Sequence, residues 1–312
     1  MTLVEFVPPT PHPLWKLCPQ MGITDVVVKV NPELTGLADP WRLSTLRSIV
    51  ERLKVEGLNV VGLEGDPFDM SPIKEYGALD CISHVEHVDH VELNDAQQPE
   101  TTLHVSARST RLNNPVNHVN PVKNKDDIRE EALSHYRELL ESMGKLGIKL
   151  LCYNFMVGKG WSRTGVREGR GGAKATYFSL DGFLTGFTRF TGLHELGAEP
   201  PDPDNPVNPV NPVQTLEDAA RHFGKRIAFI HVRDVEGDKT DFTELFHDQG
   251  DTDQFALMRT YRELGLDVPV RGDHVPEMAY DRVLTPEGTP GYFTLGRLFA
   301  NGYLKALLKS IA

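Results

Sequence analysis

The 312-residue chain predicts an α/β fold in which helices cover a parallel sheet. Short apolar runs alternate with amphipathic stretches, which is the pattern of strand–helix units. Two of the runs, at residues 226–231 and 268–271, end abruptly in the ionisable sequences HVRD and RGDH. A buried parallel strand has this form where its carboxyl end enters an active site. The two strand ends therefore indicate a metal-assisted enzyme that acts on an anionic substrate.

The predicted elements follow one another from the N-terminus. Residues 3–7 are a short apolar start, residues 24–30 (TDVVVKV) are a β-branched run, and residues 40–56 show helical spacing of apolar residues. The later elements are a strand at 59–63, a helix at 127–146, a strand at 148–155, a strand at 226–231, a helix at 253–265 and a strand at 268–271. No convincing buried strand is predicted between residues 155 and 226. The sequence thus predicts about six strands.

Two low-complexity segments, residues 80–124 and 199–213, interrupt this alternation. The first contains SHVEHVDHVE and NPVNHVNPV, and the second contains NPVNPVNPV. Proline at every third residue excludes helix and central strand and favours extended chain. His84, His87 and His90 share this period of three, which fits neither strand alternation nor a helical two-histidine metal motif. We therefore expect two exposed loop insertions, the first with solvated histidines, in a single domain of residues 1–312.

Composition and charge narrow the function classes. The formal net charge is −11 without a basic cluster, so we expect no nucleic-acid partner. No apolar run approaches the roughly 20 residues of a membrane span, and the N-terminus does not resemble a signal peptide. We accordingly expect no membrane partner. Cys18, Cys81 and Cys152 are odd in number and form no CxxC motif, so the expected location is the reducing cytoplasm.

Six short motifs occur in a defined order. They are CYNFM at 152–156, W-x-R-T at 161–164, H-x-R at 231–233, FH-x-x-G at 246–250, R-x-D-H at 271–274 and PGY-x-x-x-GRL at 290–298. In these motifs the chain resembles the mannonate dehydratase family, over most of its length outside the insertions. The resemblance implies a TIM (β/α)8-type barrel of the xylose isomerase-like kind, here incomplete or irregular. It also implies dehydration of D-mannonate to 2-keto-3-deoxygluconate with a divalent metal, Mn²⁺ being the expected ion.

The resemblance further implies catalytic and metal-binding residues. His231 falls on the metal-binding histidine of H-x-R, and Asp273 falls on the metal-binding aspartate of R-x-D-H. Asp273, His274 and Tyr292 are the expected catalytic residues, with Tyr292 as the candidate proton donor. A base must take the C2 proton of the sugar acid, and an acid must protonate the departing C3 hydroxyl. Structural alternatives stay open, namely a core histidine at 231 and a helix cap at 292.

Five residues are expected to bind the substrate: Asn154, Trp161, Arg163, Arg233 and Arg271. An arginine suits a sugar-acid carboxylate because its planar guanidinium contacts both oxygens. Cys152 alternates with Tyr153 along its strand, so we expect it to point away from the site and to pack.

Two metal-binding motifs of the family, HPDDPP and a short C-x-G turn, do not occur in this sequence. Two of four ligands remain, which predicts weak metal binding and low turnover. His194, or Asp202 with Asp204, is the alternative source of ligands. A sugar isomerase or epimerase, favoured by Glu64, and a catalytically impaired barrel relative are the other open functions. The expected partner is a small-molecule sugar acid, and a homo-oligomer stays open.

Overall fold

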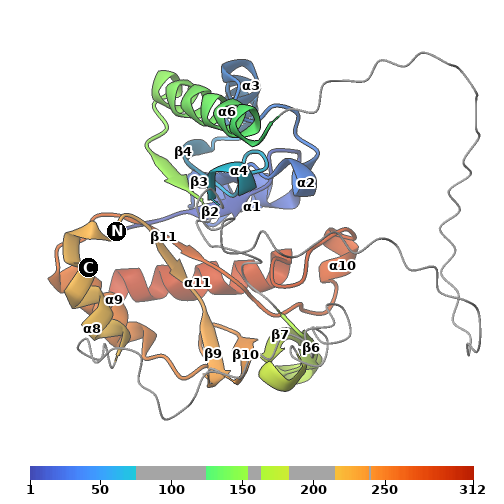
Figure 1. Ribbon diagram of the computed structural model, residues 1–312. Coiled ribbons are helices and arrows are strands. Elements are labelled where there is room, and N and C mark those ends of the chain that lie inside the picture. Colours follow the sequence, from blue (N-terminus) through green and yellow to red (C-terminus); the bar gives the residue numbers. More distant parts are fainter. Residues whose placement is uncertain (75–123, 154–162, 183–214, 239) are drawn as a thin grey trace, which may run out of the picture.

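The computed structural model describes residues 1–74, 124–153, 163–182, 215–238 and 240–312 (Figure 1). The strands are β1 (Thr2–Leu3), β2 (Glu5–Val7), β3 (Asp25–Lys29), β4 (Asn59–Glu64), β5 (Leu150–Cys152), β6 (Gly165–Glu168), β7 (Lys174–Ser179), β8 (Ile230–Val232), β9 (Asp234–Gly237), β10 (Asp241–Leu245) and β11 (Pro269–Gly272). The α-helices are α1 (Pro13–Gln20), α2 (Pro32–Thr35), α3 (Leu43–Val55), α4 (Ser71–Lys74), α6 (Lys125–Leu146), α8 (Leu216–Phe223), α9 (Gln254–Glu263), α10 (Asp281–Leu284) and α11 (Thr294–Ser310).

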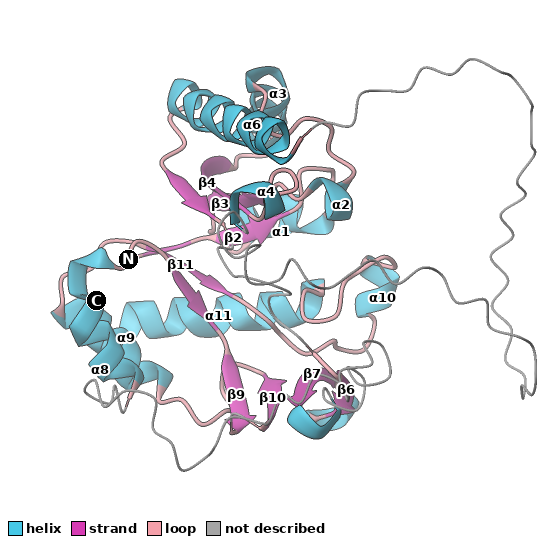
Figure 2. Cartoon of the chain, viewed as in Figure 1, coloured by secondary structure: helices cyan, strands magenta, loops and turns pink. Residues whose placement is uncertain are grey.

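The first extended segment of the chain joins two parallel sheets. β1 pairs with β11, and β2 pairs with β3, with only Val4 between the two segments. One sheet therefore has the spatial order β5, β4, β3, β2. The other continues from the adjoining β1 through β11 to β8. Helices alternate with these strands along the chain (Figure 2), which confirms the predicted α/β class. Within the described ranges, no parallel strand pairs with the outer edge of β5 or of β8.

The strand predicted at 148–155 is shorter than expected, because β5 ends at Cys152. Between residues 155 and 226, where the sequence predicts no convincing buried strand, the structure describes two strands that are only partly buried. β6 and β7 lie there and form an antiparallel sheet with β10 and β9, in which Ala175 and Thr176 of β7 are buried. β6 has no buried residue and β7 has two, so neither strand has the continuous apolar run of a buried parallel strand.

Two apolar clusters hold the parallel strands to their helices. The first lies between β2–β5 and helices α1, α3 and α6, with Leu14, Ile49 and Leu139 fully buried. The second lies between β8, β11 and helices α9 and α11. Met1 and Ile311 both pack against the second cluster, so the two ends of the chain lie side by side (Figure 1).

A buried polar network attaches the N-terminal strand to the C-terminal helix. The carboxylate of Glu5 in β2 accepts hydrogen bonds from Arg297 and Asn301 of α11. All three side chains are buried. A buried carboxylate needs such donors, because an unpaired charge in the core is costly.

The longest helix, α6, has clear end signals in the sequence. Asn124 caps its N-terminus by accepting a hydrogen bond from the backbone N–H of Asp127, at 2.8 Å. Acidic residues in its first turn favour the positive end of the helix dipole. The helix ends at Gly147, whose φ of 72° is a left-handed conformation that glycine adopts without strain.

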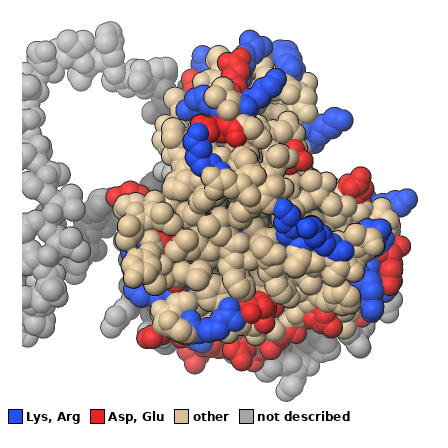
Figure 3. Space-filling view, turned by 180° about the vertical axis from the view of Figure 1, so that it is seen from behind, with Lys and Arg blue, Asp and Glu red and all other residues tan. Residues whose placement is uncertain are grey.

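On the face seen in Figure 3, acidic and basic side chains are interspersed toward the rim, and the centre is mostly uncharged. None of the helices in the described ranges is both long and apolar enough to cross a membrane. The predicted insertions lie outside the described residues, apart from residue 124, and their exposure stays a prediction.

Candidate active site

A cavity of about 500 Å³ lies at the carboxyl ends of the parallel strands. Its wall includes Glu64 at the end of β4, Cys152 at the end of β5, His231 in β8, and Asp273 directly after β11. Parallel strands have their carboxyl ends at one edge, which is where barrel enzymes place their chemistry. The chain thus brings ionisable residues from distant segments into one cavity.

The described residues predicted from the sequence gather at this cavity. His231, Arg233, Arg271, Asp273, His274 and Tyr292 all line it. Arg163 lies behind them, with its Nη2 3.4 Å from Nδ1 of His274. Asn154 and Trp161 lie outside the described residues.

Arg271 lies between the two residues expected to bind a metal. Its Nη1 is 3.0 Å from Oδ1 of Asp273, and its Nη2 is 3.2 Å from Nδ1 of His231. Nε and Nη2 also donate to the two carboxylate oxygens of Glu64, at 3.0 and 2.6 Å. Only 1% of the Arg271 side chain is exposed. Its donors are therefore directed at protein groups, and its contact with substrate stays a prediction.

The positive charge of Arg271 keeps the neighbouring carboxylates ionised. Burial by itself would raise the pKa of Asp273, but the positive charge of Arg271 outweighs this effect and lowers the pKa to about 2. Burial would likewise raise the pKa of Glu64, but the hydrogen bond from His231 and the charge of Arg271 hold it below its ordinary value. Both carboxylates are thus anions at neutral pH.

A second buried carboxylate, Glu244 in β10, organises the other side of the cavity. It is 1% exposed and accepts hydrogen bonds from Arg163, from Thr176 at 2.6 Å and from Arg233 at 2.7 Å. Its Oε2 lies 2.7 Å from Nδ1 of His274. Burial would raise the pKa of Glu244, but the hydrogen bonds from His274 and Arg163 hold it well below its usual range.

His274 connects Glu244 to Tyr292. Because the ionised Glu244 accepts the Nδ1–H of His274, the Nε2 of a neutral ring is an acceptor. The hydroxyl of Tyr292 lies 2.9 Å from this Nε2 and 3.3 Å from Oδ1 of Asp273. Burial raises the pKa of Tyr292 well above its ordinary value, and the charge of Asp273 adds to the effect. Tyr292 therefore carries its proton, and its hydroxyl lies within hydrogen-bond distance of both His274 and Asp273.

The prediction that Cys152 packs away from the site is wrong. Its Sγ lies 3.9 Å from Nε2 of His231, and the residue lines the cavity together with Tyr153. β5 ends at Cys152, so the alternation that the sequence suggests does not extend to the following residue. Burial raises the pKa of the Cys152 thiol to about 11, and the charge of Glu64 adds to this.

Glu244 has no clear signal in the sequence. It lies two positions before the FH-x-x-G motif, in the run DFTEL. Nothing in this run distinguishes it from any other polar residue of a half-buried strand. Its partners Arg163, Arg233 and His274 belong to three other segments, so only the fold brings them together.

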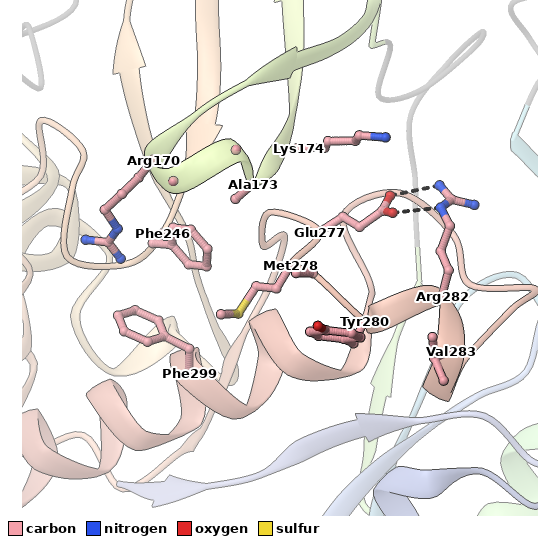
Figure 4. Close-up of a pocket in the computed structure, with 13 residues that line it drawn as sticks. Arg170, Ala173, Lys174, Phe246, Glu277, Met278, Tyr280, Arg282, Val283 and Phe299 are labelled. Atoms are coloured by element: carbon pink, nitrogen blue, oxygen red, sulfur yellow. Dashed lines mark hydrogen bonds and ion pairs between the residues drawn. The ribbon is translucent and has the colours of Figure 1, made fainter.

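A second cavity, of about 630 Å³, lies between the β6–β7 hairpin and the segments of α10 and α11 (Figure 4). Phe246 and Phe299 line it, and the guanidinium of Arg170 lies over both rings. Arg282 forms two hydrogen bonds with Glu277 at its edge, as the dashed lines in Figure 4 mark. None of the described site residues predicted from the sequence lines this cavity, so the strand-end cavity is the better candidate.

Comparison with known proteins gives a match at the level of the family. Residues 60–185 and 207–312 match the family model described as D-mannonate dehydratase. The mannonate dehydratases of Brucella canis and Brucella melitensis are 33% identical to the chain over 100 residues. That stretch is 30% of this chain and 24% of each relative, so the match spans about a quarter of their length.

The fold is similar to the crystal structure of mannonate dehydratase from Streptococcus suis serotype 2. The TM-score is 0.62 at 16% identity, and the alignment covers 100% of this chain and 95% of that chain. At this identity the likeness concerns the fold alone.

Proposed function

The chain belongs to the D-mannonate dehydratase family, and from this premise we propose that it is a hydro-lyase acting on D-mannonate or a closely similar sugar acid. The product would be 2-keto-3-deoxygluconate or its equivalent. The observation that carries the proposal is the hydrogen-bonded series Tyr292–His274–Glu244 in the strand-end cavity. Dehydration needs a base and an acid close together, and this series supplies both.

In the proposed reaction, Nε2 of His274 takes the C2 proton of the sugar acid. The resulting imidazolium is stabilised by the buried carboxylate of Glu244, which already accepts its Nδ1–H. The hydroxyl of Tyr292 protonates the departing C3 hydroxyl, which leaves as water. The proton on Nε2 then passes to the Tyr292 oxygen across their 2.9 Å hydrogen bond. Both residues regain their starting state, and the enol product tautomerises to the 2-keto acid.

Arg233 is the proposed anchor for the substrate carboxylate. It lines the cavity with 26% of its side chain exposed, whereas only 1% of Arg271 is exposed. Its Nη1 bond to Glu244 fixes the direction of the guanidinium. The planar shape of a guanidinium suits the two oxygens of a carboxylate.

A divalent metal, Mn²⁺ by the resemblance, is also part of the proposal. The expected pair, His231 and Asp273, does not enclose space for an ion in this arrangement, because Arg271 contacts both residues. Nε2 of His231, the ring nitrogen that Arg271 does not contact, faces Glu64 and Cys152. These three residues supply a set of ligand atoms that fits a metal ion. When bound, a metal would act as a Lewis acid on substrate oxygens.

The isomerase alternative rests on Glu64 as a bridging carboxylate. In this structure both oxygens of Glu64 are held by Arg271, which does not favour that role. The two absent family motifs still predict turnover below that of relatives that carry them, so the impaired relative stays a competing hypothesis.

The proposal is tested by incubating the purified chain with D-mannonate and measuring the 2-keto-3-deoxy acid formed. We expect slow but measurable formation that is lost in His274→Gln. Formation at the same rate in His274→Gln would contradict the assigned base. Undetectable formation with Mn²⁺ or Zn²⁺ in excess would favour the impaired relative.

A further inference from the structure

Glu64, Cys152 and His231 form a compact cluster of side chains that can bind a metal, and only His231 among them is a metal ligand that the family resemblance implies. One ligand atom from each residue lies within 4.8 Å of the other two. Oε2 of Glu64 is 3.4 Å from Nε2 of His231, and Sγ of Cys152 is 3.9 Å from the same nitrogen. The three residues lie at the carboxyl ends of β4 and β5 and within β8.

These spacings are close to those of a tetrahedral metal site. With ordinary bond lengths to nitrogen, oxygen and sulfur, neighbouring ligand atoms around Zn²⁺ are about 3.4–3.6 Å apart. The oxygen–nitrogen distance already meets this value, and the sulfur–nitrogen distance exceeds it by only a few tenths of an ångström. Small side-chain rotations would therefore complete three of four positions, and the cavity leaves the fourth to water or substrate.

The charges of the neighbourhood suit a divalent ion. Glu64 and Asp273 are anions, and Arg271 carries one positive charge between them. A thiolate at Cys152 adds a third negative charge, which leaves a net charge of minus two for a divalent ion to neutralise. A sulfur, a nitrogen and an oxygen ligand together favour Zn²⁺ or Co²⁺ over the oxygen-preferring Mn²⁺ and Mg²⁺.

One existing contact opposes metal binding. Nη2 of Arg271 lies 3.2 Å from Nδ1 of His231, so a neutral His231 ring accepts there and carries its proton on Nε2. A ring that binds an ion through Nε2 carries the proton on Nδ1, and this contact must then break. Metal binding also replaces the hydrogen bond from Nε2 of His231 to Glu64, so His231 loses two hydrogen bonds, whereas Arg271 keeps its bonds to Glu64 and to the carbonyl of Gly272.

We infer that Glu64, Cys152 and His231 bind one thiolate-preferring divalent ion, of the Zn²⁺ class, which links β5 to β8. These two strands form the outer edges of the described parallel series and share no strand pairing with each other. An ion between Cys152 and His231 therefore supplies a cross-link that the backbone does not. The inference deepens the proposed function, because it names the ligands of the metal and replaces the Mn²⁺ of the resemblance by a thiolate-preferring ion. Its tests measure metal binding alone, so their failure is distinguishable from failure of the proposed reaction.

The first test is titration of the metal-free full chain with Co²⁺. We expect one Co²⁺ per chain, with the near-ultraviolet absorption band of a cobalt–thiolate bond, and displacement by Zn²⁺ but not by Mn²⁺. In Cys152→Ser the band should vanish, and Zn²⁺ affinity should fall by more than about 100-fold. The matched control is the triple variant His84→Ala, His87→Ala, His90→Ala, which removes the other histidine cluster of the sequence and should keep the band. A band that persists in Cys152→Ser, or that disappears in the triple variant, overturns the proposal.

The second test uses the unaltered chain, so it does not depend on how a variant folds. Zn²⁺ at about 100-fold above its Kd should raise the melting temperature by roughly 4–6 °C, because the ion binds the folded state alone. Zn²⁺ should also slow alkylation of Cys152, measured by peptide mass spectrometry, and leave the rate at Cys81 unchanged. Protection of Cys81 in place of Cys152, or of neither residue, would overturn the assignment.

Discussion

The carboxylate of Glu64 and the guanidinium of Arg271 form a two-point ion pair, with Nε–Oε2 and Nη2–Oε1 distances of 3.0 and 2.6 Å. The two residues are 207 positions apart in the chain. Glu64 ends β4, in the sheet formed by β2–β5, and Arg271 lies in β11, in the sheet with β1 and β8. The pair therefore joins the two parallel sheets at the floor of the cavity.

Removal of the charge of Arg271 should destabilise the fold strongly. In Arg271→Gln, Glu64 and Asp273 lose their buried cation, and we expect the free energy of unfolding to fall by about 3–5 kcal/mol. Urea denaturation followed by circular dichroism measures this change. Arg221→Gln is the matched control, since Arg221 pairs with Glu263 at the surface and its loss should have little effect. Equal effects of the two substitutions would contradict the structural role of Arg271.

Glu244 should be needed for both stability and turnover. Glu244→Gln removes the anion that Arg163 and Arg233 share, so we expect the free energy of unfolding to fall by about 3–5 kcal/mol. Loss of the charge beside His274 should also lower turnover by about 100-fold or more, because the imidazolium is no longer stabilised. The control is Glu236→Gln on the exposed side of β9. A Glu244→Gln protein with unchanged melting temperature and unchanged turnover would refute this role.

Tyr292→Phe should separate chemistry from folding. The phenyl ring keeps the edge contacts with Phe6 and His274, so the melting temperature should change little. Loss of the hydroxyl should reduce kcat for 2-keto-3-deoxy acid formation by about 10²–10⁴-fold with a small change in KM. Tyr280→Phe, at an exposed tyrosine, is the control and should match the unaltered chain. Retention of kcat in Tyr292→Phe would exclude Tyr292 as the acid.

His12 should make the protein less stable in mild acid. Burial lowers the pKa of His12 from 6.5 to about 4, and the charge of Arg297 adds to this effect. The unfolded chain then binds more protons than the folded chain between these values, so His12 favours unfolding as pH falls from about 6.5 to 4. His12→Asn keeps a side chain that can cap α1 and removes this titration.

The measurement for His12 is the melting temperature of both proteins from pH 7.5 to 4.5. The two curves should nearly coincide at pH 7.5, and the unaltered chain should fall below His12→Asn as the pH decreases. Carboxylates such as Asp273 titrate in both proteins, so the difference between the curves isolates His12. Parallel curves throughout this range would show that His12 does not titrate differently in the folded state.

Local sequence patterns were sufficient to place the parallel strands and three of the helices, α3, α6 and α9, along the chain. The run at residues 24–30 contains β3, and the pattern at 127–146 matches most of α6, because periodicity and end signals act within a few residues. The same patterns located the strand ends that carry His231 and Asp273. Apolar–polar alternation did not reveal β6 and β7, since a short half-buried strand and a polar loop have similar compositions.

The tertiary structure alone decided which charges meet. Glu244 reaches Arg163 and His274 across 81 and 30 positions of sequence, and Arg271 reaches Glu64 across 207. The sequence determined that ionisable residues stand at strand ends, because backbone periodicity is local. Their partners, and the turn of Cys152 into the cavity, depend on how sheets and loops close in space. Coulomb attraction and desolvation depend on distances of a few ångströms between atoms in space, and the separation of the residues along the chain does not enter.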